Sequence, residues 1–515
     1  MGYHERLLCM IMDGTVRDRR TLQAAKIALS KEYGLGRVPP NSETLAKADP
    51  DTLPVVERLL RRKPVRTLSG VAVVAVMTSP APCPHGKCSY CPGGVETGSP
   101  QSYTGKEPAA RRALANEFDP FGQVSSRIRQ LGAIGHPTDK IDLIIMGGTF
   151  TSRPVEYQKF FVQRCFEALN GGESVSLAEA HLKNETSAHR CIGMTIETRP
   201  DVFDGPKAAF SMELGATRVE LGVQILVDDV LSGVNRGHGV EEVVQATKTA
   251  KDMGLKVCYH VMPGLPGSDP EKDIESFARV FNDGRFRPDM IKIYPTLVVK
   301  GTPLHDMWLK GAYSPYSTEE AVRVIAEMKR IVPPYVRIQR IQRDIPVPLI
   351  EAGVDKGHIR MLVRERMSSE GYRCGCIRCR EVGLMGVESY GKDDASLSTL
   401  SYEASGGMEH FISFEIPKMH ALVGYARLRL GSPSCGMDSA HIRELKVFGQ
   451  MVPIGESGEG WQHRGFGKEL MAEAERIAQE AGCGEVLVTS GVGARKYYSS
   501  IGYERAGGYM AKPLR

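Results

Sequence analysis

Residues 81–94 read APCPHGKCSYCPGG and bring three cysteines, Cys83, Cys88 and Cys91, into one short loop. The loop follows the apolar run VAVVAVMT at 71–78, which is typical of a buried strand, so the thiols lie where a strand ends. Three thiolates this close together favour a metal. A structural zinc ion needs four ligands, and His85 is the candidate for the fourth. An iron–sulfur cluster bound by three cysteines keeps one iron open instead.

An open iron is what radical S-adenosylmethionine enzymes use to bind the methionine end of their cofactor, which indicates one-electron chemistry. The CxxxxCxxC spacing of this loop is one residue longer than the usual CxxxCxxC. Spacing alone therefore leaves the zinc knuckle open, and the rest of the chain has to decide between the two.

Between residues 71 and 300, short β-rich runs alternate with helical stretches. The runs are VAVVAVMT (71–78), IDLIIM (141–146), CIGMTI (191–196), TRVELGVQ (217–224), KVCYHVM (256–262) and MIKIYPT (290–296). This alternation predicts an α/β fold with an open, parallel (βα)6 barrel. The chemistry of such barrels lies at the carboxyl ends of the strands.

Residues suited to ligand binding follow these predicted strands. Gly147 and Gly148 would let a ligand approach the backbone, Glu197 could bind an amino or ribose group, and Gln224 could add a hydrogen bond. Each of these has an ordinary alternative, a turn or a helix cap. Because all four are expected on the same edge as the cysteine loop, together they favour S-adenosylmethionine over zinc.

The C-terminal part has a second ligand motif, QHRGFG at 462–467. Gln462, Arg464, Gly465 and Gly467 fit the Q/RxxGxG/A loop of GNAT-type acetyltransferases, where backbone N–H groups bind the coenzyme A pyrophosphate. An amphipathic helix is expected from Phe466 to Gly482. The neighbouring strands are HFISFEI (410–416), ALVGYARLRL (421–430), IRELKVFG (442–449) and EVLVTSG (485–491). Tyr497 or Tyr498 would lie near the thioester, unless both simply pack a small helix.

The composition predicts a cytoplasmic protein without a membrane span. The chain has 515 residues, 42% of them hydrophobic, and its apolar runs are far shorter than a bilayer requires. Six of the 12 cysteines lie in two tight groups and the others are scattered, as expected in a reducing compartment. The interpretation gives four parts: 1–70, 71–345, 346–385 and 386–515.

Residues 1–70 are basic, with 13 Lys and Arg against 8 Asp and Glu, which accounts for the net charge of +5. The run RLLRRKPVR (58–66) is the densest part, and Tyr33 could stack on a base. Such a segment suits a phosphate backbone, so it is a candidate tRNA-binding region. A merely solvated basic surface is the alternative.

The linker 346–385 holds a second cysteine group, Cys374, Cys376 and Cys379, in RCGCIRCREVG. The CxCxxC spacing indicates a structural zinc site with a fourth ligand that the sequence does not assign, His358 being one candidate. A metal-free, reduced triplet is the alternative.

Over nearly its whole length the chain resembles the catalytic subunit of Elongator. The resemblance is carried, in order, by CPHGKCSYCPGG, IMGGTF, TIETRPD, VELGVQ, VNRGHG, IYPTLVVKGT, RIQRDIP, RELKVFG, QHRGFG and SGVGARKYYSSIGY. It implies a radical S-adenosylmethionine barrel joined to a GNAT-type domain that modifies the wobble uridine of tRNA to 5-carboxymethyluridine. It also implies a 4Fe-4S cluster on Cys83, Cys88 and Cys91. Lys140 and Tyr498 would act in the chemistry, and acetyl-coenzyme A would contact Lys140, Glu444, Leu445, Lys446, Val447, Phe466, Gly467, Lys468 and Tyr498. Eukaryotic members have an insertion in the cluster loop that is absent here, which implies a prokaryotic, archaeal protein acting without other Elongator subunits.

The implied chemistry has a physical reason. Carbon 5 of uridine and an acetyl methyl group are poor partners for polar substitution, whereas a 5′-deoxyadenosyl radical could take hydrogen from the methyl so that the carbon radical adds to the base. Thioester hydrolysis would then leave a carboxymethyl group. The wobble base lies in the single-stranded anticodon loop and can enter a pocket at low cost. An electron donor is required, and a homo-oligomer is possible. Two other classes stay open: a protein lysine acetyltransferase, and a non-catalytic tRNA-binding subunit.

Overall fold

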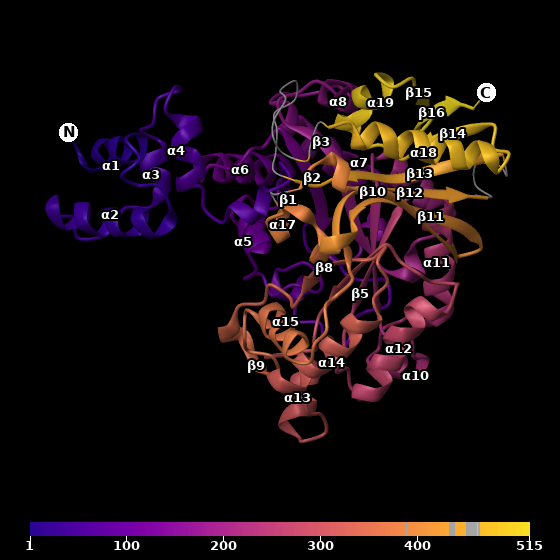
Figure 1. Ribbon diagram of the computed structural model, residues 1–515. Coiled ribbons are helices and arrows are strands. Elements are labelled where there is room, and N and C mark those ends of the chain that lie inside the picture. Colours follow the sequence, from indigo (N-terminus) through magenta and orange to yellow (C-terminus); the bar gives the residue numbers. More distant parts are fainter. Residues whose placement is uncertain (388–389, 432–437, 450–460, 462–463, 515) are drawn as a thin grey trace.

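The computed structural model describes residues 1–387, 390–431, 438–449, 461 and 464–514. Two seven-stranded sheets, one in the barrel and one in the C-terminal part, make up the body of the molecule (Figure 1). A small group of helices stands beside this body at the N-terminal end. No helix in the described residues is long and apolar enough to cross a bilayer.

The barrel sheet is entirely parallel, with strand order β1-β2-β3-β4-β5-β6-β8. Its strands are β1 (Val71–Met77), β2 (Lys140–Met146), β3 (Arg190–Thr198), β4 (Arg218–Gln224), β5 (Lys256–Val261), β6 (Met290–Ile293) and β8 (Arg337–Ile341). The open parallel architecture and the six predicted strands are confirmed. The seventh strand, β8, was not predicted because its sequence, RIQRI, has no apolar run.

The two faces of β1 and β2 differ in burial, and the difference matters for the site. Ala72, Val74 and Val76 of β1 are fully buried on the outer face, under the covering helices. The alternate residues point to the inside of the barrel, where Val73 is 40% exposed and Ala75 is partly accessible. The covering helices are α5 (Pro108–Ala115), α6 (Pro120–Ala133), α7 (Val155–Asn170), α8 (Leu177–Asn184), α9 (Gly205–Glu213), α10 (Asp228–Gly233), α11 (Val240–Asp252), α12 (Pro270–Asn282), α13 (Pro303–Leu309) and α14 (Thr318–Ile331).

The C-terminal sheet has the order β10-β11-β12-β13-β14-β16-β15, in which only the β13–β14 pair is parallel. Its strands are β10 (Ser396–Ala404), β11 (Gly407–Ile416), β12 (Ala421–Leu430), β13 (Ser439–Val447), β14 (Glu485–Val488), β15 (Glu504–Ala506) and β16 (Tyr509–Pro513). Helix α18 (Phe466–Glu480) packs on β11, β12 and β13, and the short α19 (Arg495–Ser499) follows β14. The unpredicted β10 is a mostly exposed edge strand.

The linker packs between the two sheets. It contains α15 (Ile359–Ser369), α16 (Ile377–Arg380) and α17 (Val382–Met385), while β9 (Ile350–Ala352) pairs with β7 (Val298–Val299). Helix α16 contacts both β8 of the barrel and β12 of the C-terminal sheet. The linker therefore lies against both sheets and fixes where they meet.

A buried ion-pair network joins the barrel to the C-terminal sheet. The guanidinium group of Arg443 donates to both carboxylate oxygens of Asp289, at 2.6 and 2.7 Å, and to Glu409 at 2.7 Å. Arg429 pairs with Asp252 at 2.6 Å. Although burial alone would raise the pKa of Asp289, Arg443 and the other nearby cations hold it below its usual range. Because removing one partner of such a network leaves a buried charge unpaired, the two sheets are held in one relative position.

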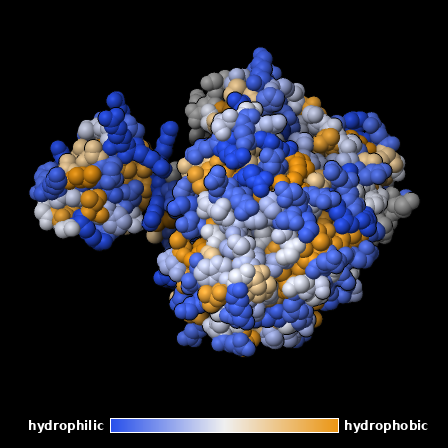
Figure 2. Space-filling view, turned by 90° about the horizontal axis from the view of Figure 1, so that it is seen from below, coloured by the Kyte–Doolittle hydropathy of each residue, from blue (hydrophilic) through white to orange (hydrophobic). Residues whose placement is uncertain are grey.

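The four N-terminal helices, α1 (Tyr3–Met12), α2 (Arg19–Glu32), α3 (Asn41–Leu45) and α4 (Leu53–Leu60), enclose an apolar core of their own. In the space-filling view they form a lobe beside the body (Figure 2). The connection to the barrel includes a hydrogen bond from the Arg62 N–H to Ile134 O and a 2.7 Å contact between Thr67 and His136.

Candidate functional site

A cavity of about 600 Å³ lies between the C-terminal sheet and the amino ends of the barrel strands; we call it the amino-edge cavity. Of the residues predicted to contact acetyl-coenzyme A that the structure describes, all but Arg464 line it. The lining ones are Lys140, Glu444, Leu445, Lys446, Val447, Gly465, Phe466, Gly467, Lys468 and Tyr498. Gln462 lies outside the described residues. The Arg464 guanidinium instead lies 5.9 Å from the ring centre of Trp461, which itself lines the cavity.

The start of α18 is built for close approach of a ligand to the backbone. Gly465 precedes the helix with a φ of 92°, a left-handed conformation that favours glycine. A Cβ at Gly467 would come within 3.2 Å of the Tyr497 hydroxyl and would narrow the space in front of the helix. A helix N-terminus with this clearance binds phosphate through its N–H groups, so these residues fit the coenzyme A pyrophosphate.

The amino-edge cavity is rich in positive charge. Lys140, Lys256 and Arg218 line it from the barrel, and Lys446 and Lys468 line it from the C-terminal sheet and α18. Burial lowers the pKa of Lys256 to about 8, an effect that Glu444 partly offsets. Burial alone would raise the pKa of Glu444, but Lys256, Arg427 and Lys446 lower it to about 2. Burial raises the pKa of Tyr498, so its hydroxyl stays protonated and can donate.

A second cavity, of about 110 Å³, lies at the opposite edge of the barrel; we call it the carboxyl-edge cavity. Gly148, Glu197 and Gln224 line it, as predicted for an S-adenosylmethionine site. Gly147 is next to it and has no room for a side chain, because a Cβ there would overlap the Thr78 hydroxyl. Gln224 ends β4 with a φ of 70°, and such strain in a non-glycine residue is common at functional sites.

The cysteine loop borders the carboxyl-edge cavity. Its Tyr90 lines the cavity, and so does Ser102, whose N–H donates to the Cys91 sulfur at 3.2 Å. Arg236 lies 3.6 Å from the Cys88 sulfur. N–H donors and cations beside sulfur stabilise thiolate ligands. These surroundings fit a cluster next to a cofactor cavity.

Two observations disfavour zinc at this loop. In the described residues, only two groups of three metal-binding side chains have ligand atoms within 4.8 Å of one another, and the loop cysteines are not one of them. Around a single zinc ion thiolates lie closer together than around a cluster, where each binds a different iron. In addition, the Arg199 guanidinium lies 2.7 Å from His85 Nε2, so a zinc ion bound to that nitrogen would lie next to another positive charge. Burial, with help from Arg199, lowers the pKa of His85 to about 4.

Sequence reasoning missed several residues of the carboxyl-edge cavity. Tyr103 donates to Glu197 at 2.7 Å, and Arg343 donates to the Ser102 carbonyl. Arg236, His260 and Arg343 also line the cavity. The strings VNRGHG and RIQRDIP, which carry the family resemblance, contain Arg236 and Arg343. The spacing of these strings in the sequence does not show that their loops lie beside the cysteines in the fold.

Only one layer of side chains separates the two cavities inside the barrel. Arg218 lines the amino-edge cavity, and Glu220, two residues further along β4, lines the carboxyl-edge cavity. Two residues of a strand span about 7 Å. Glu220 accepts hydrogen bonds from Lys292 and, at 2.7 Å, from His260. Glu220, His260 and Cys258 form the second close group of potential metal ligands, but Lys292 already neutralises the charge of Glu220.

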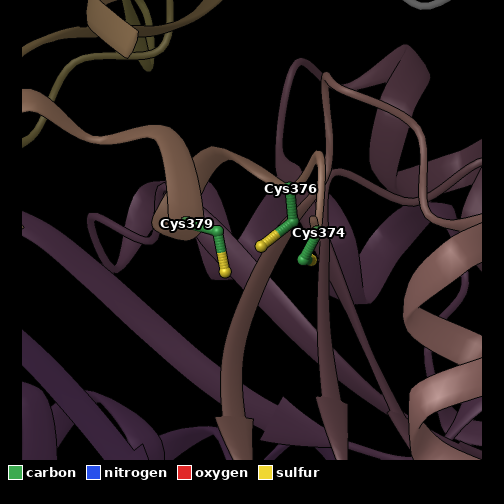
Figure 3. Close-up of side chains that lie close together, drawn as sticks. All are labelled: Cys374, Cys376 and Cys379. Carbon is green, nitrogen blue, oxygen red and sulfur yellow. The ribbon is translucent and has the colours of Figure 1, made fainter. Parts of the chain in front are cut away.

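The linker cysteines converge as predicted. The sulfur atoms of Cys374, Cys376 and Cys379 all lie within 4.8 Å of one another, close together in Figure 3. Hydrogen bonds from Cys374 and Cys379 lower the pKa of Cys376. The exposed His358, proposed as a fourth ligand, does not belong to this close group. The geometry fits a single tetrahedral ion.

Models of known protein families match the N-terminal lobe, the barrel and the C-terminal part of the chain. Residues 7–68 match the ELP3 N-terminal domain, 80–280 the radical SAM superfamily, 288–369 the radical SAM C-terminal domain, and 388–503 the acetyltransferase (GNAT) family.

Individual relatives match across both sheets. The chain is 47% identical to a tRNA uridine(34) acetyltransferase of Methanocaldococcus jannaschii, over 99% of this chain and 97% of the relative. It is 42% identical to Elongator complex protein 3 of Homo sapiens, over 96% and 93%. The solved structure of archaeal Methanocaldococcus infernus Elp3 with an N-terminal deletion (1-46) matches with a TM-score of 0.78 at 45% identity, over 87% of this chain and all of that chain. The chain belongs to the family of Elongator complex protein 3 and the tRNA uridine(34) acetyltransferases.

Proposed function

We propose that this protein converts the wobble uridine of tRNA to 5-carboxymethyluridine, using acetyl-coenzyme A and radical S-adenosylmethionine chemistry. The observation that carries the proposal is the pairing of the two cavities. The carboxyl-edge cavity, which the cysteine loop borders, and the basic amino-edge cavity occupy opposite edges of one barrel. Arg218 and Glu220 lie between them.

The residues of the carboxyl edge would hold the radical cofactors. Cys83, Cys88 and Cys91 bind the cluster, and Gly147, Gly148, Glu197 and Gln224 bind S-adenosylmethionine. When bound, these groups supply a carbon-centred radical that can remove a hydrogen atom from an unactivated methyl group. Tyr103 orients Glu197 through their 2.7 Å hydrogen bond.

The residues of the amino edge would hold acetyl-coenzyme A. The N-terminus of α18 binds the pyrophosphate, the β13 backbone from Glu444 to Val447 lies along the arm, and Lys140 contacts the arm from the barrel side. Tyr498 keeps its proton and can donate a hydrogen bond to the bound coenzyme. Water later cleaves the thioester. The hydrolysis leaves a carboxylate group, which gives the carboxymethyl product its negative charge.

The structure offers less support for a protein lysine acetyltransferase. The barrel residues Lys140, Asp142 and Gly193 line the cavity on the side opposite the C-terminal sheet. A lysine side chain of another protein would have to displace this edge of the barrel. The presence of two matched cavities in one chain also argues against a non-catalytic tRNA-binding role.

The remaining parts would serve binding and architecture. The basic N-terminal lobe contacts the tRNA backbone and stands clear of the body, where it can reach beyond the barrel (Figure 2). The linker cysteines bind a structural zinc ion that pins the linker between the sheets.

The experiment that tests the function uses anaerobically reconstituted protein, reductant, S-adenosylmethionine, acetyl-coenzyme A and unmodified tRNA. Nucleoside mass spectrometry should detect 5-carboxymethyluridine, and the product should disappear when any one component is omitted. Gly467→Trp should abolish it by filling the space before α18, whereas Gly484→Ala, at a glycine with open space around it, should not. Acetyl-lysine on an added protein, with the tRNA unmodified, would favour the lysine acetyltransferase instead.

A further inference from the structure

The two cavities pose a problem of distance. Strand β1 begins at Val71, which lines the amino-edge cavity, and ends at Met77, so the start of the cysteine loop lies about 20 Å from that cavity, although the linings of the two cavities come within about 7 Å of each other on β4. The buried network around Asp289 and Arg443 holds the C-terminal sheet against the barrel. A hinge motion that brought the cavities together would break this network, and breaking buried pairs is costly.

An accessible strip on the inner faces of β1 and β2 connects the two cavities. On β2, Lys140 and Asp142 line the amino-edge cavity and Met146 lines the carboxyl-edge cavity. Because side chains alternate along a strand, Ile144 points to the same inner face, and it is partly accessible. Its register partner on β1 is Ala75, while Val73 pairs with Asp142.

The strip is apolar, and polar side chains of the next two strands lie beside it: Thr195 of β3 is the register partner of Ile144, and Arg218 of β4 is the register partner of Thr195. The hydroxyl of Thr195 is buried and has no hydrogen-bond partner, whereas the Nε of Arg218 forms an ion pair with a carboxylate oxygen of Glu220 at 3.6 Å. Val73 is 40% exposed although it lies inside the barrel. An unpaired buried hydroxyl beside accessible apolar side chains indicates a space that a partly polar ligand occupies.

We propose that the acetyl-thioester arm of acetyl-coenzyme A lies along this strip and carries the acetyl group through the barrel to the carboxyl-edge cavity. The proposal rests on the function proposed above and adds the route. The arm is thin, flexible and uncharged, with methylene groups that suit Val73, Ala75 and Ile144 and amide groups that suit the Thr195 hydroxyl. From Asp142 to Met146 is four residues, about 13 Å of strand.

Site-directed alkylation tests the route without cluster, S-adenosylmethionine or tRNA. Bromoacetyl-coenzyme A carries a reactive carbon at the acetyl methyl position; a thiolate forms a bond to that carbon and bromide leaves. In the full-length Ile144→Cys and Met146→Cys proteins, the new thiol should be alkylated at least about tenfold faster by bromoacetyl-coenzyme A than by bromoacetamide at equal concentration. Excess coenzyme A should suppress the difference, and peptide mass spectrometry identifies the labelled residue.

The matched control is Val155→Cys, at an exposed position on α7, where both reagents should react at similar rates. Ala75→Phe should block labelling of Met146→Cys while leaving coenzyme A affinity unchanged, because the phosphate-binding residues are at α18. Labelling at Ile144→Cys and Met146→Cys no faster than at Val155→Cys would overturn the proposal, as would labelling of Met146→Cys that persists with Ala75→Phe. Labelling along the strip without any modified tRNA would instead overturn the proposed function and leave the route standing.

Discussion

At the residue scale, cysteines of one chain differ through their surroundings. Cys165 is fully buried and burial raises its pKa well above the ordinary value, so it is an inert core residue. Cys88 is also buried, but Arg236 lies 3.6 Å from its sulfur and His85 lies 3.2 Å away. Donors and cations beside a sulfur atom stabilise it as a metal ligand.

The first prediction concerns these cysteines. Cys88→Ala should lose the S-adenosylmethionine-sensitive 4Fe-4S signal after anaerobic reconstitution, because a cluster with one ligand missing is not retained in its native form. Electron paramagnetic resonance and iron analysis measure the loss. Cys9→Ala, at an exposed position in the N-terminal lobe, is the control and should keep both. A signal that survives in Cys88→Ala would rule out the assigned ligand set.

The second prediction concerns His441, which is fully buried in β13 with neither ring nitrogen hydrogen-bonded. Burial, together with Arg429 and Arg443, lowers its pKa to about 4. Between about pH 6.5 and pH 4 the unfolded chain therefore binds a proton that the folded protein does not, so stability falls as the pH falls. The shift corresponds to about 3 kcal/mol.

His441→Leu should flatten the pH dependence of the free energy of unfolding by about this amount over the same range. Urea denaturation at several pH values between 7 and 4 measures it. Parallel curves for the two proteins would show that His441 titrates normally.

At the element scale, the turn Gly491–Val492–Gly493 determines how closely the C-terminal sheet approaches the barrel. A Cβ at Gly491 would overlap the Ile192 carbonyl of β3, and one at Gly493 would lie 2.5 Å from the Arg190 Cβ. Both clashes are with β3 near its amino end, beside the amino-edge cavity. The two glycines in SGVGARKYY are therefore required for packing between the sheets.

The third prediction follows from this packing. Gly491→Ala should destabilise the folded protein by about 1–3 kcal/mol and weaken coenzyme A binding, because β3 must shift away from the turn. Chemical denaturation and calorimetric titration measure the two effects. Gly484→Ala is the matched control, since a Cβ there meets nothing. Equal behaviour of the two variants would mean that the close contact is not required.

Elements with a strong sequence pattern could be predicted, and others could not. The six apolar strands and α18 follow from buried periodic side chains such as Phe466, Leu470 and Ala474. Strand β8 has three polar residues among its five, and β10 is an exposed edge, so neither has the composition of a buried strand. The positions of Gly148, Glu197 and Gln224 were predictable because strands of one parallel sheet end at one edge.

At the scale of the whole molecule, the arrangement of the domains could not be read from any motif. It depends on charges far apart in sequence, such as Asp289 of the barrel and Arg443 of β13, which are buried together. Lys140 was assigned to the acetyl-coenzyme A site only through the family resemblance. In the structure it lines the amino-edge cavity, because β2 begins there.

The fourth prediction concerns the N-terminal lobe. Deleting residues 1–70 should weaken tRNA binding and make it less dependent on salt, because phosphate contacts release counterions. Each lost contact should reduce the slope of log K against log salt concentration by about 0.7 to 0.9. Filter binding over a range of salt concentrations measures the slope. Identical slopes with and without the lobe would make its basic residues an ordinary solvated surface.

The central claim is that the acetyl methyl group meets the radical generated at the carboxyl edge. The most direct measurement uses acetyl-coenzyme A deuterated in the methyl group, with the reconstituted protein, reductant, S-adenosylmethionine and tRNA. The account predicts deuterium in the recovered 5′-deoxyadenosine, together with carboxymethylated uridine, by mass spectrometry. Carboxymethylated uridine formed with no deuterium in 5′-deoxyadenosine would contradict it.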